Sequence, residues 1–66
     1  MDYKLLNKVI DDSGLKRSFI AKEMGLSPKI LHDRTAGVSE WKVKEMIAFT
    51  NLMNLKKKVR DDIFFS

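Results

Sequence analysis

Cysteine is absent from the sequence, and proline and histidine each occur once, as Pro28 and His32. Without cysteine the chain has no disulfide bridge and no thiolate metal site, and a zinc site built from His and Cys ligands is excluded. Long apolar runs are missing too, since the longest, from Met46 to Phe49, is far shorter than a membrane span or the core of a signal peptide. We therefore expect a soluble protein of the reducing cytoplasm.

Catalytic and cofactor-binding patterns are also missing. The three glycines are scattered at positions 14, 25 and 37, so the chain has no glycine-rich phosphate loop. The acidic pairs Asp11-Asp12 and Asp61-Asp62 are sequence neighbours, which on a helix point about 100° apart rather than toward one substrate. We expect a protein that is not an enzyme and that binds no cofactor, metal or small-molecule substrate.

The apolar residues recur at helical spacing. A length of 66 residues predicts a single small domain, 1–66. Its first helix is predicted over 3–12, where Leu6, Val9 and Ile10 form one apolar face, and Ser13-Gly14 ends it. The second and third helices are predicted over 17–24 and 28–35.

The second half of the chain continues the helical pattern. A fourth helix is predicted over 42–54, with an apolar face formed by Met46, Phe49 and Met53. The segment that follows from Lys56 indicates a short fifth helix or a helical turn. No alternating strand pattern appears, so the expected fold is all-α, a compact bundle of five short helices.

The turn between the second and third helices has the clearest local signals. Gly25 can adopt the left-handed conformation that ends a helix. Ser27 offers a hydroxyl to the free N–H groups of the next helix, and Pro28 suits its first position, where a missing N–H costs nothing. These residues predict a helix-turn-helix, with the third helix starting at Pro28.

Positive charge is concentrated around this turn. The net charge of +4 divides into −1 for residues 1–15, +4 for 16–44 (seven bases against three acids) and +1 for 45–66. A modest excess of this kind is also compatible with a merely solvated surface. Its coincidence with the helix-turn-helix favours a polyanionic partner.

The spacing of the residues around the turn resembles that of a known family. The pattern comprises Ile20-Ala21, Gly25, Ser27, Leu31 and Gly37, joined by SEW at 39–41 and IFF at 63–65. It is similar to the helix-turn-helix of the phage Cro and CI repressors, also called the lambda-repressor-like or XRE-type family, and above all to its small Cro-like members. The resemblance implies a transcriptional repressor in a bacterial host cell that binds a double-stranded DNA operator.

The third helix supplies the candidates for reading bases. In a major-groove helix, the first residues and those one turn later reach base edges. This selects Ser27, Pro28, Lys29, His32 and Asp33. Lys29 can donate to guanine, whereas Asp33 can only accept, which suits cytosine N4. His32 can donate to a base or a phosphate, or it is an exposed histidine without a role.

Six basic residues are candidates for phosphate contacts. By resemblance, Arg17 lies where the family has a glutamine that touches the DNA backbone. The others are Lys16, Lys22, Arg34, Lys42 and Lys44. Lys22 is equally compatible with a solvated helix position. Arg34 stands where the family often has an apolar residue, so it either binds phosphate or pairs with Asp11 or Glu23.

Aromatic and apolar residues in the second half have two possible roles. Trp41 is expected to pack in the core, because proteins that stack single-stranded bases carry several exposed aromatic side chains. A set of apolar residues exceeds what one helix face needs: Ile47, Leu52, Val59, Phe64 and Phe65. They either complete a small core or form the surface of a weak homodimer. Family members usually dimerise on a palindromic operator, with recognition helices about 34–36 Å apart, so we expect a dimer that forms on DNA.

The leading hypothesis is a sequence-specific, phage Cro-like repressor. An antitoxin or plasmid regulator would have the same fold and is the nearest alternative. A further possibility is a protein-interaction module, such as an anti-repressor, that does not bind DNA and recruits a partner helix through Phe64-Phe65.

Overall fold

The chain forms five α-helices and no β-strand in the computed structural model, which describes all of residues 1–66. The helices are α1 (Tyr3–Ser13), α2 (Arg17–Glu23), α3 (Pro28–Thr35), α4 (Val43–Met53) and α5 (Lys57–Phe64). The predicted all-α architecture of five short helices is thus confirmed, with boundaries that differ by one residue in α1, α2 and α4. The last segment is a full helix rather than a turn.

Side chains at the helix starts explain where two of the helices begin. Asp2 Oδ1 accepts a hydrogen bond from the N–H of Leu5 at 2.9 Å, at the start of α1. Ser27 Oγ accepts one from the N–H of Ile30 at 3.2 Å, and Pro28 occupies the first position of α3. Both side chains satisfy N–H groups that have no partner inside the helix. Lys16, at the start of α2, makes no such bond.

The core is built by residues from all five helices and from the loop before α4. The buried apolar residues are Leu6, Ile10, Ile20, Ala21, Leu31, Trp41, Phe49, Ile63 and Phe64. Each fully buried large side chain contributes about 1.5–3 kcal/mol through the hydrophobic effect. Trp41 is therefore a core residue, as expected from the sequence.

Three aromatic rings form the centre of the second half. The ring of Trp41 lies 5.5 Å from that of Phe49 and 5.1 Å from that of Phe64, and the last two are 6.1 Å apart, measured between centroids. Their edge-on and tilted contacts are the favourable ones for aromatic pairs. Phe64, one of the residues considered for a dimer surface, thus completes the core instead.

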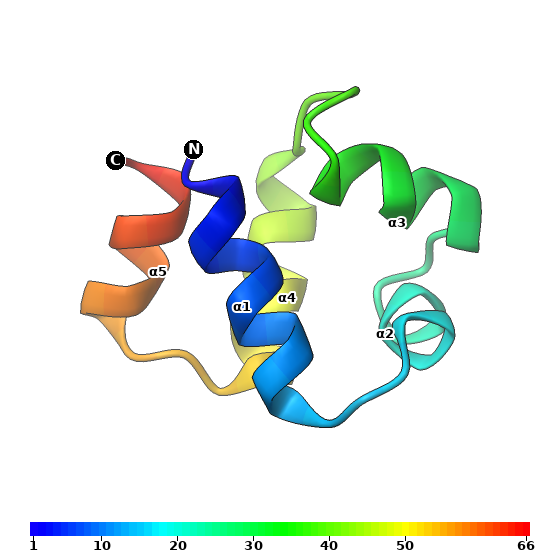
Figure 1. The fold of residues 1–66 in the computed structure, drawn as a ribbon, viewed down its shortest axis with the longest axis horizontal. Coiled ribbons are helices and arrows are strands. Elements are labelled where there is room, and N and C mark those ends of the chain that lie inside the picture. Colours follow the sequence, from blue (N-terminus) through cyan, green and yellow to red (C-terminus); the bar gives the residue numbers. More distant parts are fainter.

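Helices α1 and α4 lie in the middle of the molecule. Figure 1 shows α2 and α3 on one side and α5 on the other, with α1 and α4 between them. The N–H of Asp2 donates to the carbonyl of Ile63 at 2.8 Å, so the two chain ends lie together beside α5. The molecule measures 27 × 23 × 20 Å. None of its helices has the length and apolar character that crossing a membrane would require.

Candidate functional site

The outer side of α3 carries the residues that the sequence singled out for reading bases. Ser27, Pro28, Lys29 and His32 are exposed, and Asp33 is half-buried. Positions 29, 32 and 33 lie on one face of the helix because they are three and four residues apart. The opposite face, with Leu31 and Thr35, is buried. The structure therefore places these predicted residues together on an accessible side of α3.

Two of these residues already contact each other. Lys29 Nζ lies 3.2 Å from Asp33 Oδ2, one turn further along α3. The sequence spacing of four allows such a pair on any helix. An exposed ion pair is weak, because water competes for both groups. Lys29 and Asp33 can therefore exchange this contact for another partner.

Four of the six basic residues considered for phosphate contacts are free. Lys16, Lys22, Lys42 and Lys44 are exposed, and none of them forms an ion pair. Lys16 precedes the first turn of α2, and Lys42 and Lys44 flank the first residue of α4. These side chains can accept an anionic partner without losing an internal contact.

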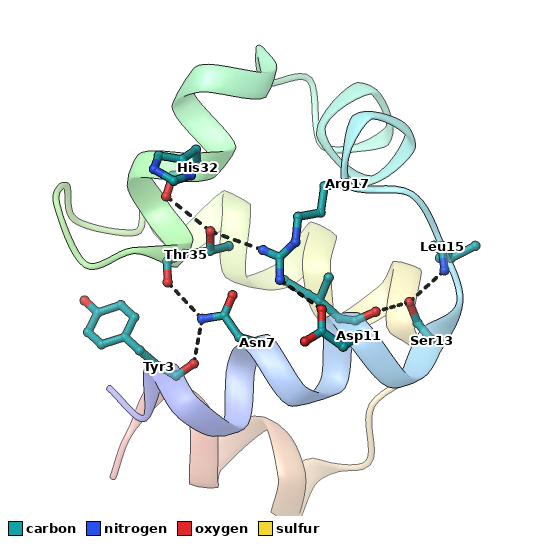
Figure 2. Close-up of polar contacts among 9 residues, drawn as sticks. Tyr3, Asn7, Asp11, Ser13, Leu15, Arg17, His32 and Thr35 are labelled. Atoms are coloured by element: carbon teal, nitrogen blue, oxygen red, sulfur yellow. Dashed lines mark hydrogen bonds and ion pairs between the residues drawn. The ribbon is translucent and has the colours of Figure 1, made fainter.

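Arg17 points back toward α1 rather than outward (Figure 2). Its Nη2 lies 3.2 Å from Asp11 Oδ1, and its Nη1 donates to Thr35 Oγ1 at 3.5 Å. The guanidinium thereby connects α1, α2 and α3. To contact a phosphate, as predicted, the Arg17 guanidinium must break or share its ion pair with Asp11. The competing carboxylate lies on α1, so the sequence around Arg17 does not reveal it.

A second polar contact joins α1 to the end of α3. Asn7 Nδ2 donates to the carbonyls of Tyr3, at 2.8 Å, and Thr35, at 3.0 Å. Thr35 Oγ1 in turn donates to the carbonyl of His32 at 3.2 Å. Figure 2 shows these bonds side by side with the contacts of Arg17. Nothing in the helical pattern of residues 3–12 singled out Asn7 for this role, because its partner is brought to it by the fold.

The interpretation of Arg34 as a partner of Asp11 or Glu23 is wrong, and its other predicted role, a phosphate contact, would have to compete with an internal partner. Its Nε and Nη2 donate to the two carboxylate oxygens of Glu45, at 2.8 and 3.2 Å. Its Nη1 donates to Ser39 Oγ. The side chains of Arg34 and Glu45 are only 13% and 4% exposed. Arg34 lies on the side of α3 that faces α4, so it is used inside the molecule.

The ion pair keeps both groups charged. Burial alone would raise the pKa of Glu45, but the hydrogen bonds from Arg34 and the Lys42 backbone, together with the two positive charges, outweigh burial and lower that pKa. The hydrogen bond to Glu45 likewise raises the pKa of Arg34 despite its partial burial. The N–H of Lys42 donates to Glu45 Oε1 at 3.0 Å, so the carboxylate also caps the start of α4.

A groove of about 420 Å³ lies between α4 and α5. Three exposed apolar side chains line it, Val43 (71% exposed), Ile47 (56%) and Phe65 (70%). We call it the α4/α5 groove; its other lining residues are Met46, Thr50, Asn51, Arg60 and Phe64.

The structure divides the residues for which the sequence left either a core position or a dimer surface open. Ile47 and Phe65 belong to the α4/α5 groove as exposed residues. Leu52 and Val59 instead pack against the core and do not line the groove. Val43 lies outside the apolar stripe of α4, so the helical pattern gives no sign that it lines this groove. Only the position of α5 shows which apolar residues stay exposed.

A scan against protein-family models, a search of curated proteins and a search of solved structures found no match to this chain. The features that bear on its function are therefore those of its own residues. These are an exposed polar face on α3, unpaired lysines beside α2 and α4, and an apolar groove between α4 and α5.

Proposed function

We propose that the chain is a sequence-specific double-stranded DNA-binding protein, a transcriptional repressor of the phage Cro type. The observation that carries the proposal is the two-sided character of α3. Leu31 and Thr35 are buried on the inner face of α3, whereas Lys29 and His32 are exposed on its outer face. A helix held in this way can enter a major groove without exposing the core.

In this proposal α2 and α3 form a helix-turn-helix, with α3 as the recognition helix. Four residues, 24–27, separate the two helices. The N–H of Leu26 donates to the carbonyl of Ala21 at 2.8 Å, and Gly25 has a φ of 71°. These features close the turn tightly, which supports the proposed motif.

The chemistry of the outer face suits base edges. Lys29 donates to guanine O6 or N7, and Asp33 accepts from cytosine N4. Ser27 and His32 add a hydroxyl and an imidazole at the start and the middle of α3. Lys29 and Asp33 lie 3.2 Å apart in an exposed ion pair, which base edges can replace at little cost.

Phosphate contacts provide most of the affinity. Lys16, Lys22, Lys42 and Lys44 are exposed and unpaired, and their contacts release counterions on binding. The affinity therefore falls steeply as the salt concentration rises. Arg17 also contacts a phosphate if that phosphate displaces the carboxylate of Asp11 from its guanidinium.

A homodimer on a palindromic operator completes the proposal, because one small module binds DNA weakly. Of the dimer residues considered, Ile47 and Phe65 remain as exposed candidates, both in the α4/α5 groove. Sedimentation of the protein with a selected duplex tests this part. A complex with two protein copies is expected, and Phe65→Glu should reduce it to one copy while leaving the isolated protein folded.

The central experiment is a binding-site selection from random duplex DNA, followed by titration at low and moderate salt. We expect an enriched, palindromic sequence and salt-sensitive shifts in the NMR signals of α3. The absence of any salt-sensitive shift of those signals would contradict the proposal. The DNA sequence recovered would also distinguish a phage operator from the target of an antitoxin or plasmid regulator.

The α4/α5 groove favours one second candidate, a protein-interaction module without DNA binding. Its exposed Ile47 and Phe65 could receive an apolar helix. Such a module has no use for exposed lysines around α3. The interaction module is favoured over DNA binding only if neither the generic nor the selected duplex shifts the NMR signals of α3.

A further inference from the structure

The end of α3 is joined to the start of α4 by one network of hydrogen bonds. Arg34 holds the carboxylate of Glu45 through two parallel bonds, at 2.8 and 3.2 Å, and donates a third bond to Ser39 Oγ in the connecting loop. Glu45 also accepts from the N–H of Lys42 at 3.0 Å. We call this set, formed by Arg34, Ser39, Glu45 and the Lys42 backbone, the Arg34–Glu45 bridge.

The bridge is expected to contribute little net stability to the fold. The side chains of Arg34 and Glu45 are 13% and 4% exposed, so both charges lose most of their hydration. This loss offsets much of their attraction, and replacing such a pair with apolar side chains of similar size is often neutral or stabilising. A guanidinium and a carboxylate joined by two bonds do, however, satisfy each other in only one relative orientation.

The two helices that the bridge joins carry different parts of the proposed interface. Arg34 directly follows His32 and Asp33 on α3, two of the residues that would read bases. Glu45 lies in the first turn of α4, next to Lys44 and close to Lys42, the free lysines proposed for phosphate contacts. The bridge therefore lies between the base-reading and the phosphate-contacting side chains.

We infer that Arg34 and Glu45 are positioning residues, which set the direction of α3 against the start of α4 and thereby determine sequence discrimination. This inference rests on the proposed DNA-binding function. Base contacts need their geometry to within a fraction of an ångström, whereas phosphate contacts by flexible lysines do not. Loss of the bridge should therefore reduce specific binding more than generic binding.

The test uses the full chain with both charges removed, Arg34→Met together with Glu45→Met. The net charge stays at +4, because one base and one acid are lost, so the attraction to phosphate is unchanged. Affinities are measured for the duplex selected with the wild-type protein and for a generic duplex of equal length. The matched control is Lys58→Met with Asp62→Met, an exposed ion pair on α5 whose removal also costs one base and one acid and leaves the net charge at +4.

The expected result is a difference between the two duplexes. The bridge variant should lose roughly tenfold in affinity for the selected duplex, comparable to one lost base contact, and should bind the generic duplex within about twofold of wild type. Its melting temperature should change little, because the lost cap of α4 and the removal of two buried charges act in opposite directions. The control variant should bind both duplexes like wild type.

A structural readout and a second variant accompany the titration. Trp41 is the only tryptophan, so its indole N–H, which donates to the carbonyl of Arg34 at 2.9 Å, gives a single NMR signal at the bridge. This signal should shift and exchange faster in the bridge variant. Arg34→Lys keeps the charge but loses the two parallel bonds, and its discrimination should lie between those of wild type and the double variant.

The outcomes separate the inference from the function on which it rests. If the wild-type protein binds no duplex, the proposed function and this inference both fail. If wild type discriminates between the duplexes and both bridge variants discriminate equally well, only the inference is overturned. The Arg34–Glu45 bridge would then serve packing alone.

Discussion

The indole Nε1 of Trp41 donates a hydrogen bond to the backbone carbonyl of Arg34 at 2.9 Å. The same indole ring packs against Phe49 and Phe64 in the core. One side chain thus connects the aromatic centre of α4 and α5 to the last turn of α3. The orientation of α3 is consequently coupled to the packing of the core.

Replacing Trp41 with phenylalanine should destabilise the protein by about 2 kcal/mol, because the carbonyl of Arg34 loses its donor and the smaller ring leaves unfilled space. Urea unfolding followed by far-UV circular dichroism measures the effect. Val38→Ala is the control, since Val38 is 73% exposed and should change stability by less than about 0.5 kcal/mol. Equal stability of the two variants would show that the indole contact contributes nothing.

Gly37→Ala should destabilise the protein more than Gly14→Ala. Both glycines have a left-handed backbone, with φ of 79° and 73°, which costs an alanine about 1–2 kcal/mol. Only at Gly37 would the added Cβ also meet the ring of Tyr3, at 3.3 Å, whereas nothing lies within 4 Å at Gly14. Thermal unfolding compares the two. The difference should disappear when Tyr3 is replaced by alanine, and its persistence would rule out the ring as its cause.

The stability of the protein should decrease as the pH falls below the ordinary pKa of a glutamate, about 4.3, partly through Glu45. The contacts with Arg34 lower the pKa of Glu45 in the folded protein, so in this range the unfolded chain binds a proton that the folded protein excludes. The stabilisation is complete above the unfolded pKa and is lost as the pH falls through the folded pKa. Urea unfolding at several pH values should show a smaller decrease for Arg34→Met/Glu45→Met than for wild type. An identical decrease would contradict the assignment to Glu45.

Two lysine substitutions should have different effects on DNA binding. Lys29→Ala should cost about 1–3 kcal/mol on the selected duplex and relax the preference at one base pair. Lys42→Ala should weaken binding to all duplexes alike and reduce the dependence on salt by about one ion. Titrations at three salt concentrations distinguish the two patterns. An unchanged base preference in Lys29→Ala would mean that the reading face of α3 is assigned incorrectly.

Asp33→Asn should tighten binding to generic DNA and weaken discrimination. The carboxylate, which now pairs with Lys29, would repel phosphate wherever it does not meet a base donor, so its neutralisation removes this penalty. The selection experiment repeated with this variant should lose its preference at one position. A generic affinity equal to that of wild type would argue that Asp33 lies away from the DNA.

Local signals were sufficient for the helices. Gly25, Ser27 and Pro28 act on their own backbone or on that of the next turn, so the start of α3 could be predicted to the residue. The apolar spacing in α1 and α4 likewise identified Leu6 and Phe49, which are fully buried. These features depend on neighbours within about four residues, and the chain carries that information directly.

Partners across the fold could not be predicted. Arg34 was expected to contact phosphate, Asp11 or Glu23, yet it pairs with Glu45, eleven residues further on. Which partner Arg34 meets depends on the angle between α3 and α4, and the local spacing of residues does not encode that angle. The same holds for Phe64, which fills the core beside Trp41 rather than a surface.

The sequence by itself determined the first four helices to within one residue at each end, which faces are apolar, and the position of the positive charge around residues 16–44. Short-range backbone chemistry and helical periodicity are sufficient for those features. Only the tertiary structure decided that Arg17 and Arg34 are engaged internally while Lys29 and Lys42 are exposed, and that Ile47 and Phe65 border a groove. Contacts between distant segments follow from how five helices bury their apolar faces together, so they exist only once the whole chain has packed.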